Sequence, residues 1–424
     1  SCLSFSARSK RMKMYLVGGA VRDELLGFPV NERDWVVVGA TMEQMLARDY
    51  IPVGKFFPVF LHPETKEEYA LARLERKVSG GYHGFTFDTS SSVTLEQDLM
   101  RRDLTINAMA KTANGKIIDP YGGQADLEKK LLRHVSPAFA EDPVRVLRVA
   151  RFAARYASLG FKVAPETLAL MQEMGNQGEL DFLVPERVTK EMLRALGEAT
   201  PVAFIQVLRQ CNALRKILPE VDALYGVPQN IEHHPEKDAG IHTEMVLHQA
   251  SRLSPESIVR FAALVHDVGK GLTPQALWPR HVDHEIFGEP LVQALCQRLR
   301  LPSDFQALAR LVARYHLLCH KAQECSAADI LTIFEHCDAF RKPQRFAQFV
   351  LACEADFRGR PGYETKEYRQ GTLLYLAFAT AQHINTKEIV ASCQAKGEQG
   401  EAIKNAIHEA RLEAINQLLK IAPK

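Results

Sequence analysis

The chain has 424 residues, of which 46 % are hydrophobic and 25 % charged, and its formal net charge is +2. This composition excludes a disordered or fibrous chain and indicates a globular protein of roughly two to four domains. The net charge is too small to indicate nucleic-acid binding by itself, so local clusters of charge must carry that argument. No apolar run reaches the roughly 18 residues that cross a bilayer, so we expect no membrane partner.

The eight cysteines are scattered without a C-x-x-C pair. This spacing favours free thiols in a reducing cytoplasm over disulfides or a zinc site. The first eleven residues, SCLSFSARSKR, are rich in Ser and Arg and superficially resemble an organellar transit peptide. Because Met12 begins the recognisable sequence, we expect residues 1–11 to be a disordered upstream or expression-derived extension of a cytoplasmic protein.

Residues 14–38, MYLVGGAVRDELLGFPVNERDWVVV, form a strand–turn–helix–strand pattern. Apolar residues predict a buried strand, and Gly18 with Gly19 predicts a tight turn. A short helix follows from Ala20 to Leu26, and Gly27 ends it. The glycine amides and the helix start can approach phosphate oxygens because no side chain intervenes.

The second strand of this pattern begins at an acidic pair, Glu32 and Asp34. Side chains two apart on a strand point to the same side, so the two carboxylates repel each other. A divalent cation between them removes this repulsion, which predicts a Mg²⁺ site. A metal beside a phosphate-binding turn indicates nucleotide chemistry.

A third strand is predicted in KEEYALAR, residues 66–73. Glu68 lies on one face of this strand and is a candidate third acid of the site. An exposed edge glutamate is an equal alternative, and Glu67 is a competitor. The Gly- and Ser-rich residues 77–92 predict a long loop, which in compact domains is commonly functional. Two capping boxes predict helices: Thr41 with Gln44 before residues 42–48, and Thr94 with Gln97 before residues 95–110.

Residues 141–152, EDPVRVLRVARF, predict a helix with Asp142 as its N-cap. Arg145, Arg148 and Arg151 recur every three residues as a basic stripe, which is either a solvated face or an anion site. A carboxylate beside a guanidinium accepts the pairing edges of cytosine and adenine and leaves groups unpaired against guanine and uracil. Asp142 and Arg145 are such a pair, while Arg148 and Arg151 suit triphosphate charge.

Histidine is concentrated in one region, with nine of the fifteen between His233 and His320. Such a cluster is typical of a site for a first-row transition metal. The candidate ligands are His242, His266, Asp267, His281 and His284.

These motifs resemble, in order, those of the tRNA nucleotidyltransferase and bacterial poly(A) polymerase group. The matches are LVGGAVRD with ERD at residues 16–34, RRDLTINA at 101–108, DPYGG at 119–123, EDPVR at 141–145, and ER-x-x-x-E at 186–191. One departure is Glu32, which stands where the group has aspartate. The string H…HD-x-G-K-G…H-x-x-H resembles the HD superfamily of metal-dependent phosphohydrolases, whose final aspartate has no obvious position here; the expected helix reads Tyr315-His316-Leu317-Leu318.

The resemblance implies a bacterial CCA-adding enzyme with an α+β fold: a nucleotidyltransferase head containing a small mixed sheet, followed by all-α neck, body and HD domains. The expected divisions are a head at 12–140, a helical neck and body at 141–225, an HD domain at 226–345 and a helical tail at 346–424. The chain would add CCA to tRNA from CTP and ATP without a nucleic-acid template, as a monomer or homodimer. The implied groups are Glu32, Asp34 and Glu68 for catalysis, the first two with Mg²⁺; Gly18, Gly19, Arg22, Arg102, Asp142, Arg145, Arg148 and Arg151 for the nucleotide; and His242, His266, Asp267, His281 and His284 for Ni²⁺ or another divalent metal at the HD site.

Three alternatives stay open at this point. A bacterial poly(A) polymerase shares the head motifs but is disfavoured by the HD motif. An HD phosphohydrolase whose Glu32 impairs polymerisation is the second, and an RNA-binding module without catalysis is the third. Phosphatase, 2′-nucleotidase or 2′,3′-cyclic phosphodiesterase activity is what the HD resemblance implies.

Overall fold

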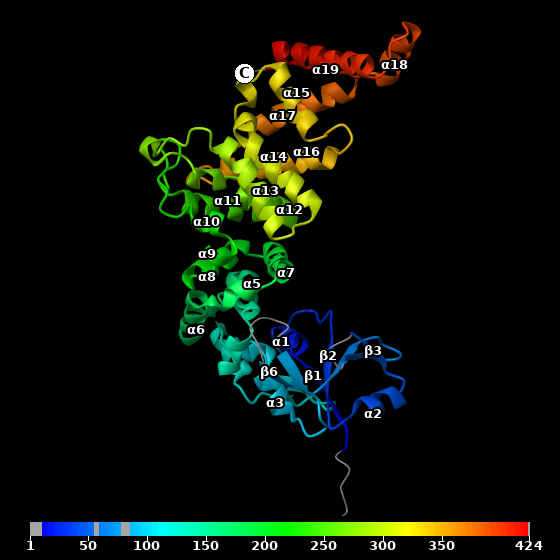
Figure 1. The fold of residues 1–424 in the computed structure, drawn as a ribbon, viewed down its shortest axis with the longest axis vertical. Coiled ribbons are helices and arrows are strands. Elements are labelled where there is room, and N and C mark those ends of the chain that lie inside the picture. The colour runs from blue at the N-terminus through cyan, green and yellow to red at the C-terminus, as the bar shows by residue number, and fades with distance from the viewer. Residues whose placement is uncertain (1–10, 55–58, 78–84, 423–424) are drawn as a thin grey trace, which may run out of the picture. The chain divides into compact units, whose positions relative to one another are not determined.

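The computed structural model describes residues 11–54, 59–77 and 85–422. Most of the predicted N-terminal extension and the middle of the predicted 77–92 loop lie outside these ranges. The fold consists of two compact units: Ser1–Glu191 with Gln206–Lys216, and Met192–Ile205 with Ile217–Lys424. Figure 1 shows the strands of the first unit in blue to cyan and the helices α11 to α19 of the second in green to red.

A seven-stranded mixed sheet with the order β3-β4-β5-β2-β1-β8-β9 is the framework of the first unit. Its strands are β1 (Lys13–Val17), β2 (Asp34–Val38), β3 (Ile51–Val53), β4 (Val59–Leu61), β5 (Glu68–Leu71), β8 (Ala110–Lys111) and β9 (Ile117–Ile118). Among the described strands of this sheet, β2 and β5 are the one parallel pair, because the chain between them crosses over through α2, β3 and β4. The predicted head with a small mixed sheet is confirmed.

The register between β2 and β5 places two of the predicted acids side by side. Asp34 pairs with Glu68 in this parallel ladder, so the two side chains stand on the same face of the sheet. Glu67 points to the other face, where its Oε2 accepts a hydrogen bond of 2.7 Å from Trp35 Nε1. Strand β2 begins at Asp34, so Glu32 lies in the segment just before it.

Both faces of the sheet are covered by apolar side chains of helices. Val36 packs in one core cluster with Leu95 and Leu99 of α3 (Leu95–Met100). Its neighbour Val37 packs on the opposite face with Met45 of α2 (Met42–Ala47). The other α-helices of this unit, including those that continue into the second, are α1 (Gly19–Leu25), α4 (Gly123–Lys129), α5 (Val144–Tyr156), α6 (Pro165–Asn176), α7 (Pro185–Leu196), α8 (Pro201–Gln210) and α9 (Leu214–Ile217).

The predicted capping boxes at Thr41 and Thr94 are both present. The second helix is shorter than predicted, however, because α3 ends at Met100 rather than near residue 110. Backbone hydrogen bonds to another segment take over beyond it: Thr105 N donates to Arg133 O, and Val135 N donates to Asp103 O. The RRDLTINA stretch is therefore held by tertiary contacts and not by a continuous α-helix, and only Thr105–Asn107 form a short 3-10 helix within it.

Two short pairings differ from the sequence analysis. β6 (Leu74–Lys77) pairs antiparallel with β7 (Phe85–Asp88), so part of the predicted 77–92 loop is a hairpin strand. β10 (Leu131–Leu132) pairs with β11 (Lys162–Val163), and β11 lies inside the neck and body at 141–225 that were expected to be all-α. Strands of two to four residues carry too few alternating positions for a period of two to be visible in the sequence.

The second unit is helical, as predicted for the HD region and tail. Its helices are α10 (Pro219–Asp222), α11 (Ala239–Leu253), α12 (Ser257–Val265), α13 (His284–Arg298), α14 (Ser303–His320), α15 (Ala327–His336), α16 (Pro343–Arg358), α17 (Arg369–Gln382), α18 (Thr386–Ala395) and α19 (Glu401–Ile421). Among the described residues, no helix combines the length and apolarity needed to cross a membrane.

A buried arginine anchors α12, the helix that leads directly into His266 and Asp267. Arg260 is 6 % exposed, and its guanidinium donates to four backbone carbonyls: Ser254 O at 2.8 Å, Leu196 O at 2.7 Å, Glu198 O at 2.8 Å and Ser251 O at 3.1 Å. These bonds join the end of α11 and the end of α7 to α12. Loss of hydrogen bonds between a charged donor and buried acceptors lowers the stability of the fold, because the buried acceptors are left without partners.

We expect Arg260→Met to lower the free energy of unfolding by about 3 kcal/mol, since methionine fills much of the volume but leaves four carbonyls without this donor. Urea denaturation followed by circular dichroism measures the change. Arg252→Met, on exposed helix surface, is the matched control and should stay within about 0.5 kcal/mol of the parent. Equal losses for the two variants would contradict the anchoring role.

Candidate functional sites

A cavity of about 380 Å³ in the first unit gathers most of the residues predicted to bind a nucleotide. Its lining contains seven arginines against four acidic residues, so the surplus of positive charge suits an anion. The lining residues are Gly18, Gly19, Arg22, Asp34, Arg73, Glu75, Arg101, Arg102, Asp103, Asn107, Asp142, Val144, Arg145, Arg148, Phe152 and Arg187.

The glycine turn lies against two arginines at this cavity. Gly18 has φ +70°, and a Cβ there would lie 3.1 Å from an Arg102 nitrogen. A side chain at this position would be strained and would crowd the guanidinium, which explains the glycine. Arg22 is buried, donates to Asn107 Oδ1 at 2.6 Å, and stacks 5.5 Å from the Phe152 ring centroid. The turn and both guanidiniums are thus preorganised.

The acidic pair lies at the edge of this cavity. Desolvation by surrounding protein atoms raises the pKa of Asp34; the guanidinium of Arg102 opposes this, and the charge of Glu32 raises it further. Glu32 is therefore close enough to repel Asp34, and Glu68 adjoins Asp34 through the strand register. Carboxylate oxygens on these neighbouring segments are ligands of the kind that Mg²⁺ prefers, so the residue types fit a divalent cation.

The side chains of Asp142 and Arg145, the pair predicted to accept cytosine and adenine, have different hydrogen-bond partners. Both residues line the cavity, but the Asp142 carboxylate accepts two hydrogen bonds from Arg187, at 3.3 and 3.2 Å. The Arg145 guanidinium instead donates to the carbonyls of Ala138, at 3.0 Å, and Arg101. Arg187 belongs to the ER-x-x-x-E motif, and its place beside Asp142 could not be read from spacing because 45 residues separate the two.

The basic stripe on α5 divides between two environments. Arg148 lines the cavity and donates to Asp103 Oδ2 at 2.7 Å. Burial alone would raise the pKa of Asp103, but the guanidiniums of Arg148 and Arg145 lower it overall. Arg151 is not among the lining residues; it is 8 % exposed and donates to Glu191 Oε2 at 2.6 Å. Three helical residues fall short of a full turn, so a three-residue repeat drifts around the helix, and Arg151 faces α7 rather than the cavity.

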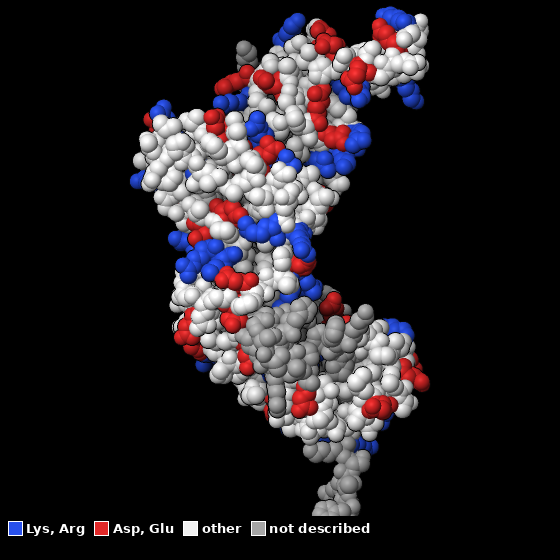
Figure 2. All heavy atoms as spheres, in the orientation of Figure 1, with Lys and Arg blue, Asp and Glu red and all other residues white. Residues whose placement is uncertain are grey.

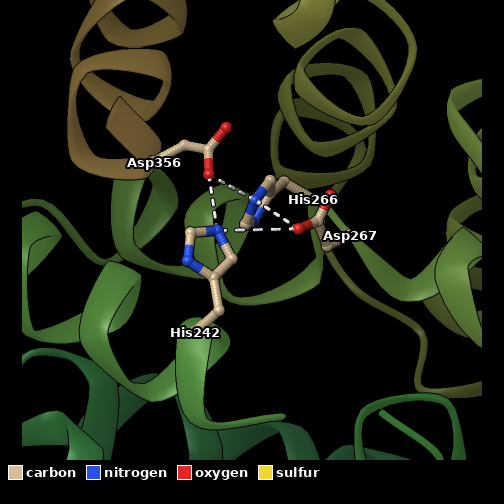
Figure 3. A group of neighbouring side chains, drawn as sticks. All are labelled: His242, His266, Asp267 and Asp356. Atoms are coloured by element: carbon tan, nitrogen blue, oxygen red, sulfur yellow. Dashed lines mark hydrogen bonds and ion pairs between the residues drawn. The ribbon is translucent and has the colours of Figure 1, made fainter. Parts of the chain in front are cut away.

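Four side chains converge in the second unit to form the HD cluster: His242, His266, Asp267 and Asp356 (Figure 3). One ligand atom from each lies within 4.8 Å of all the others. Asp356 Oδ1 is 2.8 Å from His242 Nε2 and 3.0 Å from His266 Nε2. Asp267 Oδ2 is 3.2 Å from His266 Nε2.

Asp356 is the acid for which the sequence analysis found no position. It comes from α16, which the predicted domain boundary at 345 assigns to the helical tail. The helix expected to carry it, α14, supplies His316 and His320 instead. A single aspartate 89 residues beyond Asp267 carries no local pattern, so only the packing of α16 against α11, α12 and α14 identifies it.

A second group lies beside the first and shares Asp267. His284 Nε2 and His316 Nε2 are 3.3 and 3.4 Å from Asp267 Oδ1, and 3.2 Å from each other. Asp267 Oδ1 is buried without a hydrogen-bond partner among the described residues. A bare Cβ on Gly269 would lie 1.9 Å from His284 O, so this glycine lets the first turn of α13 approach Asp267.

The histidine tautomers follow from backbone contacts. Each of the four histidines places Nδ1 on a carbonyl oxygen: His242 on Gly359 O at 3.0 Å, His266 on Ala263 O at 2.6 Å, His284 on His281 O at 2.9 Å, and His316 on Val312 O at 2.8 Å. A carbonyl only accepts, so Nδ1 carries the proton and Nε2 faces the carboxylates. Nε2 atoms and buried carboxylates that converge in this way fit divalent metal ions.

His281 lies outside both groups, contrary to the expectation that it is a ligand. Its Nδ1 is 2.8 Å from Thr273 Oγ1 and its Nε2 is 2.7 Å from Pro228 O. Both ring nitrogens are therefore engaged elsewhere. Its backbone carbonyl instead orients His284, so the H-x-x-H spacing arises from a helix start in which only the second histidine faces the cluster.

Glu236 supports the HD cluster from behind. Its Oε1 lies 3.1 Å from His242 Nδ1 and 2.9 Å from His234 Nδ1. Burial would raise its pKa, but hydrogen bonds from His234 and His242 lower the pKa of Glu236 to about 2. A carboxylate on the far nitrogen of a ligating histidine fixes the ring and increases its basicity.

Comparisons with known proteins match both the head and the HD region of the chain. The Poly A polymerase head domain matches residues 14–133, the probable RNA and SrmB-binding site of polymerase A matches 160–225, and the HD domain matches 240–339. The Multifunctional CCA protein of Nitrosococcus oceani is 58 % identical over 406 residues, which cover 96 % of this chain and 98 % of that protein.

Solved structures share the fold at lower identity. The Bacillus stearothermophilus CCA-adding enzyme in complex with CTP is 22 % identical, with a TM-score of 0.64 over 96 % of this chain and 89 % of that one. The Thermotoga maritima CCA-adding enzyme complexed with tRNA is 20 % identical, with a TM-score of 0.63 over 96 % and 88 %.

The fold and the arginine-lined cavity define a tRNA nucleotidyltransferase with an appended HD domain. The chain belongs to the multifunctional CCA protein family. The resemblance stated from the sequence is thereby confirmed, and the high identity along the whole chain argues against a bacterial poly(A) polymerase and against an RNA-binding module without catalysis.

We expect metal binding at the HD cluster to compete with protons. Burial would lower the pKa of His266, but Asp267 and Asp356 raise it to about 10, so at neutral pH a metal must displace this proton. Affinity for Ni²⁺ should therefore rise about tenfold per pH unit for each proton released. Isothermal titration calorimetry between pH 6.5 and 8.5, in buffers of different ionisation enthalpy, counts the protons; affinity independent of pH would contradict the expectation.

Proposed function

We propose that the head adds C, C and A in turn to the 3′ end of tRNA, using CTP and ATP, with Mg²⁺ held by Glu32 and Asp34. The observation that carries this proposal is the alignment of Asp34 with Glu68 at the edge of the arginine-lined cavity. A divalent cation bound there supplies Lewis-acid stabilisation of the charge on the transferring phosphoryl group. The other contributions to catalysis are the positioning of the reactants and electrostatic stabilisation, which matter most for phosphoryl transfer.

The chain's own residues divide the work at this site. Gly18 and Gly19 let the backbone approach the phosphates, and Arg22 keeps the turn in place through Asn107. Arg102 and Arg148 neutralise triphosphate charge as planar, multi-donor groups. Glu68 is a third acid that adjoins the metal ligands.

The base is recognised at Asp142, with Arg145 as the proposed guanidinium partner. Arg187 supports this role because its two hydrogen bonds hold the Asp142 carboxylate in a fixed orientation. Recognition by a fixed carboxylate and guanidinium favours cytosine and adenine, since guanine and uracil would leave buried donors and acceptors unpaired.

The tRNA backbone has a candidate surface on the helices that follow. Figure 2 shows Lys and Arg side chains gathered over α7 to α9. The exposed basic residues of these helices within the first unit are Lys190, Arg209, Arg215 and Lys216. Contacts of this kind to phosphates give affinity without sequence preference, which suits an enzyme that acts on every tRNA. We propose that this activity takes place in the cytoplasm, in a monomer or homodimer. The seven described cysteines are all free thiols, which fits a reducing compartment.

Substitutions of Glu32 test the proposed function of the head. We expect the parent chain to add all three nucleotides to a tRNA lacking CCA, Glu32→Asp to retain addition, and Glu32→Gln to lose at least about 100-fold, since an amide removes the charge that holds the cation. Incorporation of labelled CTP and ATP in Mg²⁺ measures this, with GTP and UTP as controls for base selection. Activity in Glu32→Asp alone would mean that Glu32 impairs polymerisation and that the HD domain carries the working activity.

The HD domain is proposed to be a metal-dependent phosphohydrolase that acts on phosphate monoesters or 2′,3′-cyclic phosphodiesters, with Ni²⁺ as its metal. A cavity of about 540 Å³ opens over the ligands, and cationic side chains line it: Lys270, Arg280, Lys321 and Arg360. Positive charge around a divalent metal cluster suits a phosphate substrate. Lys270 Nζ is 2.9 Å from Asp267 Oδ2, so one of these cations is held beside a proposed metal ligand.

We expect Asp356→Asn to abolish this hydrolysis while leaving CCA addition unchanged, because the substitution removes a charged ligand from one site only. The loss should exceed the roughly 10- to 100-fold that follows from removing an outer partner of a metal ligand. Release of phosphate from 2′-AMP and opening of 2′,3′-cyclic AMP, both in Ni²⁺, are the measurements. Equal hydrolysis by the variant would show that Asp356 is not a ligand of the working site.

A further inference from the structure

The second oxygen of Asp356 faces a histidine that belongs to neither ligand group. Oδ1 of Asp356 is directed toward His242 and His266, whereas Oδ2 lies 2.6 Å from His320 Nε2. His320 is the last residue of α14, its side chain is 21 % exposed, and it lines the HD cavity. The two oxygens of one carboxylate therefore have different partners.

Behind His320 lies a buried tyrosine. The Tyr368 hydroxyl is 2.8 Å from His320 Nδ1 and 3.2 Å from Cys319 Sγ. Tyr368 is 4 % exposed, and its ring packs 5.1 Å from the Phe357 centroid. A Cβ on Gly371 would lie 3.0 Å from the ring, so the glycine leaves the ring its space. Tyr368 is thus fixed by packing, independently of its hydrogen bonds.

The hydrogen bonds that run from Asp356 through His320 to Tyr368 allow one consistent assignment of donors and acceptors. An ionised carboxylate only accepts, so His320 Nε2 must carry a proton. In the neutral ring Nδ1 then has a lone pair and accepts the hydroxyl proton of Tyr368. Burial raises the pKa of Tyr368 well above its usual range, so the phenol keeps the proton that it donates. The Cys319 thiol lies on the phenol oxygen as a weak further donor.

We infer that Tyr368 and His320 are positioning residues of the HD site: Tyr368 holds His320 in the Nε2–H tautomer, and His320 holds Oδ2 of Asp356 so that Oδ1 faces the metal position. This inference rests on the proposed HD function. The physical reason is that a carboxylate free to rotate would present either oxygen, and one anchored oxygen removes that freedom before the metal arrives.

Two readouts test the inference without relying on turnover. The first is the tautomer of His320, read from the ¹⁵N shifts of histidine-labelled apoprotein. The second is the affinity and stoichiometry of Ni²⁺ binding by calorimetry. Tyr368→Phe keeps the ring and removes only the hydroxyl, and Tyr375→Phe, a 43 % exposed tyrosine in α17, is the matched control.

We expect Tyr368→Phe to lose the single Nε2–H tautomer and to bind Ni²⁺ roughly 10- to 100-fold more weakly, with unchanged stoichiometry. His320→Gln, whose side-chain amide still donates toward Oδ2, should keep most of the affinity, whereas His320→Leu should lose it. Tyr375→Phe should match the parent in both readouts, and thermal unfolding of all variants shows that each is folded.

Two results would overturn the inference. Unchanged tautomer and affinity in Tyr368→Phe would remove Tyr368 from the site. Loss of a whole equivalent of Ni²⁺ in both His320 variants would make His320 a ligand rather than a positioning residue. Failure of the proposed function is distinguishable: it appears as parent protein that binds Ni²⁺ with the expected Tyr368 dependence but hydrolyses neither 2′-AMP nor 2′,3′-cyclic AMP.

Discussion

Both sites depend on one constraint: side chains with charge of the same sign lie close together, and groups of opposite charge must neutralise them. The HD cluster buries two carboxylates, Asp267 and Asp356, among histidines that direct Nε2 toward them. An uncompensated buried carboxylate is costly enough to be neutralised or paired. Protons on the imidazoles or a metal cation can both supply the compensating positive charge, so the same arrangement of side chains can exist with or without a metal.

The head cavity meets the opposite problem with the same physics. Its arginines outnumber its acids, yet several are already committed to internal partners, such as Arg148 to Asp103 and Arg145 to backbone carbonyls. An incoming nucleotide therefore competes with hydrogen bonds that exist in the free protein, and only the difference contributes to its binding. This limits ground-state affinity and leaves more of the interaction for the charge that develops during phosphoryl transfer.

Both sites also use backbone geometry that no side chain could replace. Gly18 adopts a left-handed conformation beside Arg102, and Gly269 allows the start of α13 to lie against Asp267. Other residues support the sites indirectly, by holding a site residue in place: Glu236 orients His242, and Arg187 orients Asp142. Arg187 comes from 45 residues beyond Asp142, so the precision of the head site depends on the packing of whole helices, whereas Glu236 lies only a short way before His242 in the chain.

The sequence by itself determined the local elements and the local motifs. Strand, glycine turn and helix at residues 14–25, the capping boxes at Thr41 and Thr94, and the adjacent His266 and Asp267 all follow from interactions within a few residues, which leave periodic or fixed-offset patterns. The family resemblance rests on the same local strings.

Only the tertiary structure decided which distant residues share a site. It brought Asp356 into the HD cluster, directed His281 away from it, joined Arg187 to Asp142, and turned Arg151 toward Glu191. It also ended α3 at Met100, where backbone partners from residues 131–135 replaced those of the helix. The reason is common to all: contacts between residues tens of positions apart depend on the packing and register of whole elements, and a short stretch of sequence carries no periodicity that records them.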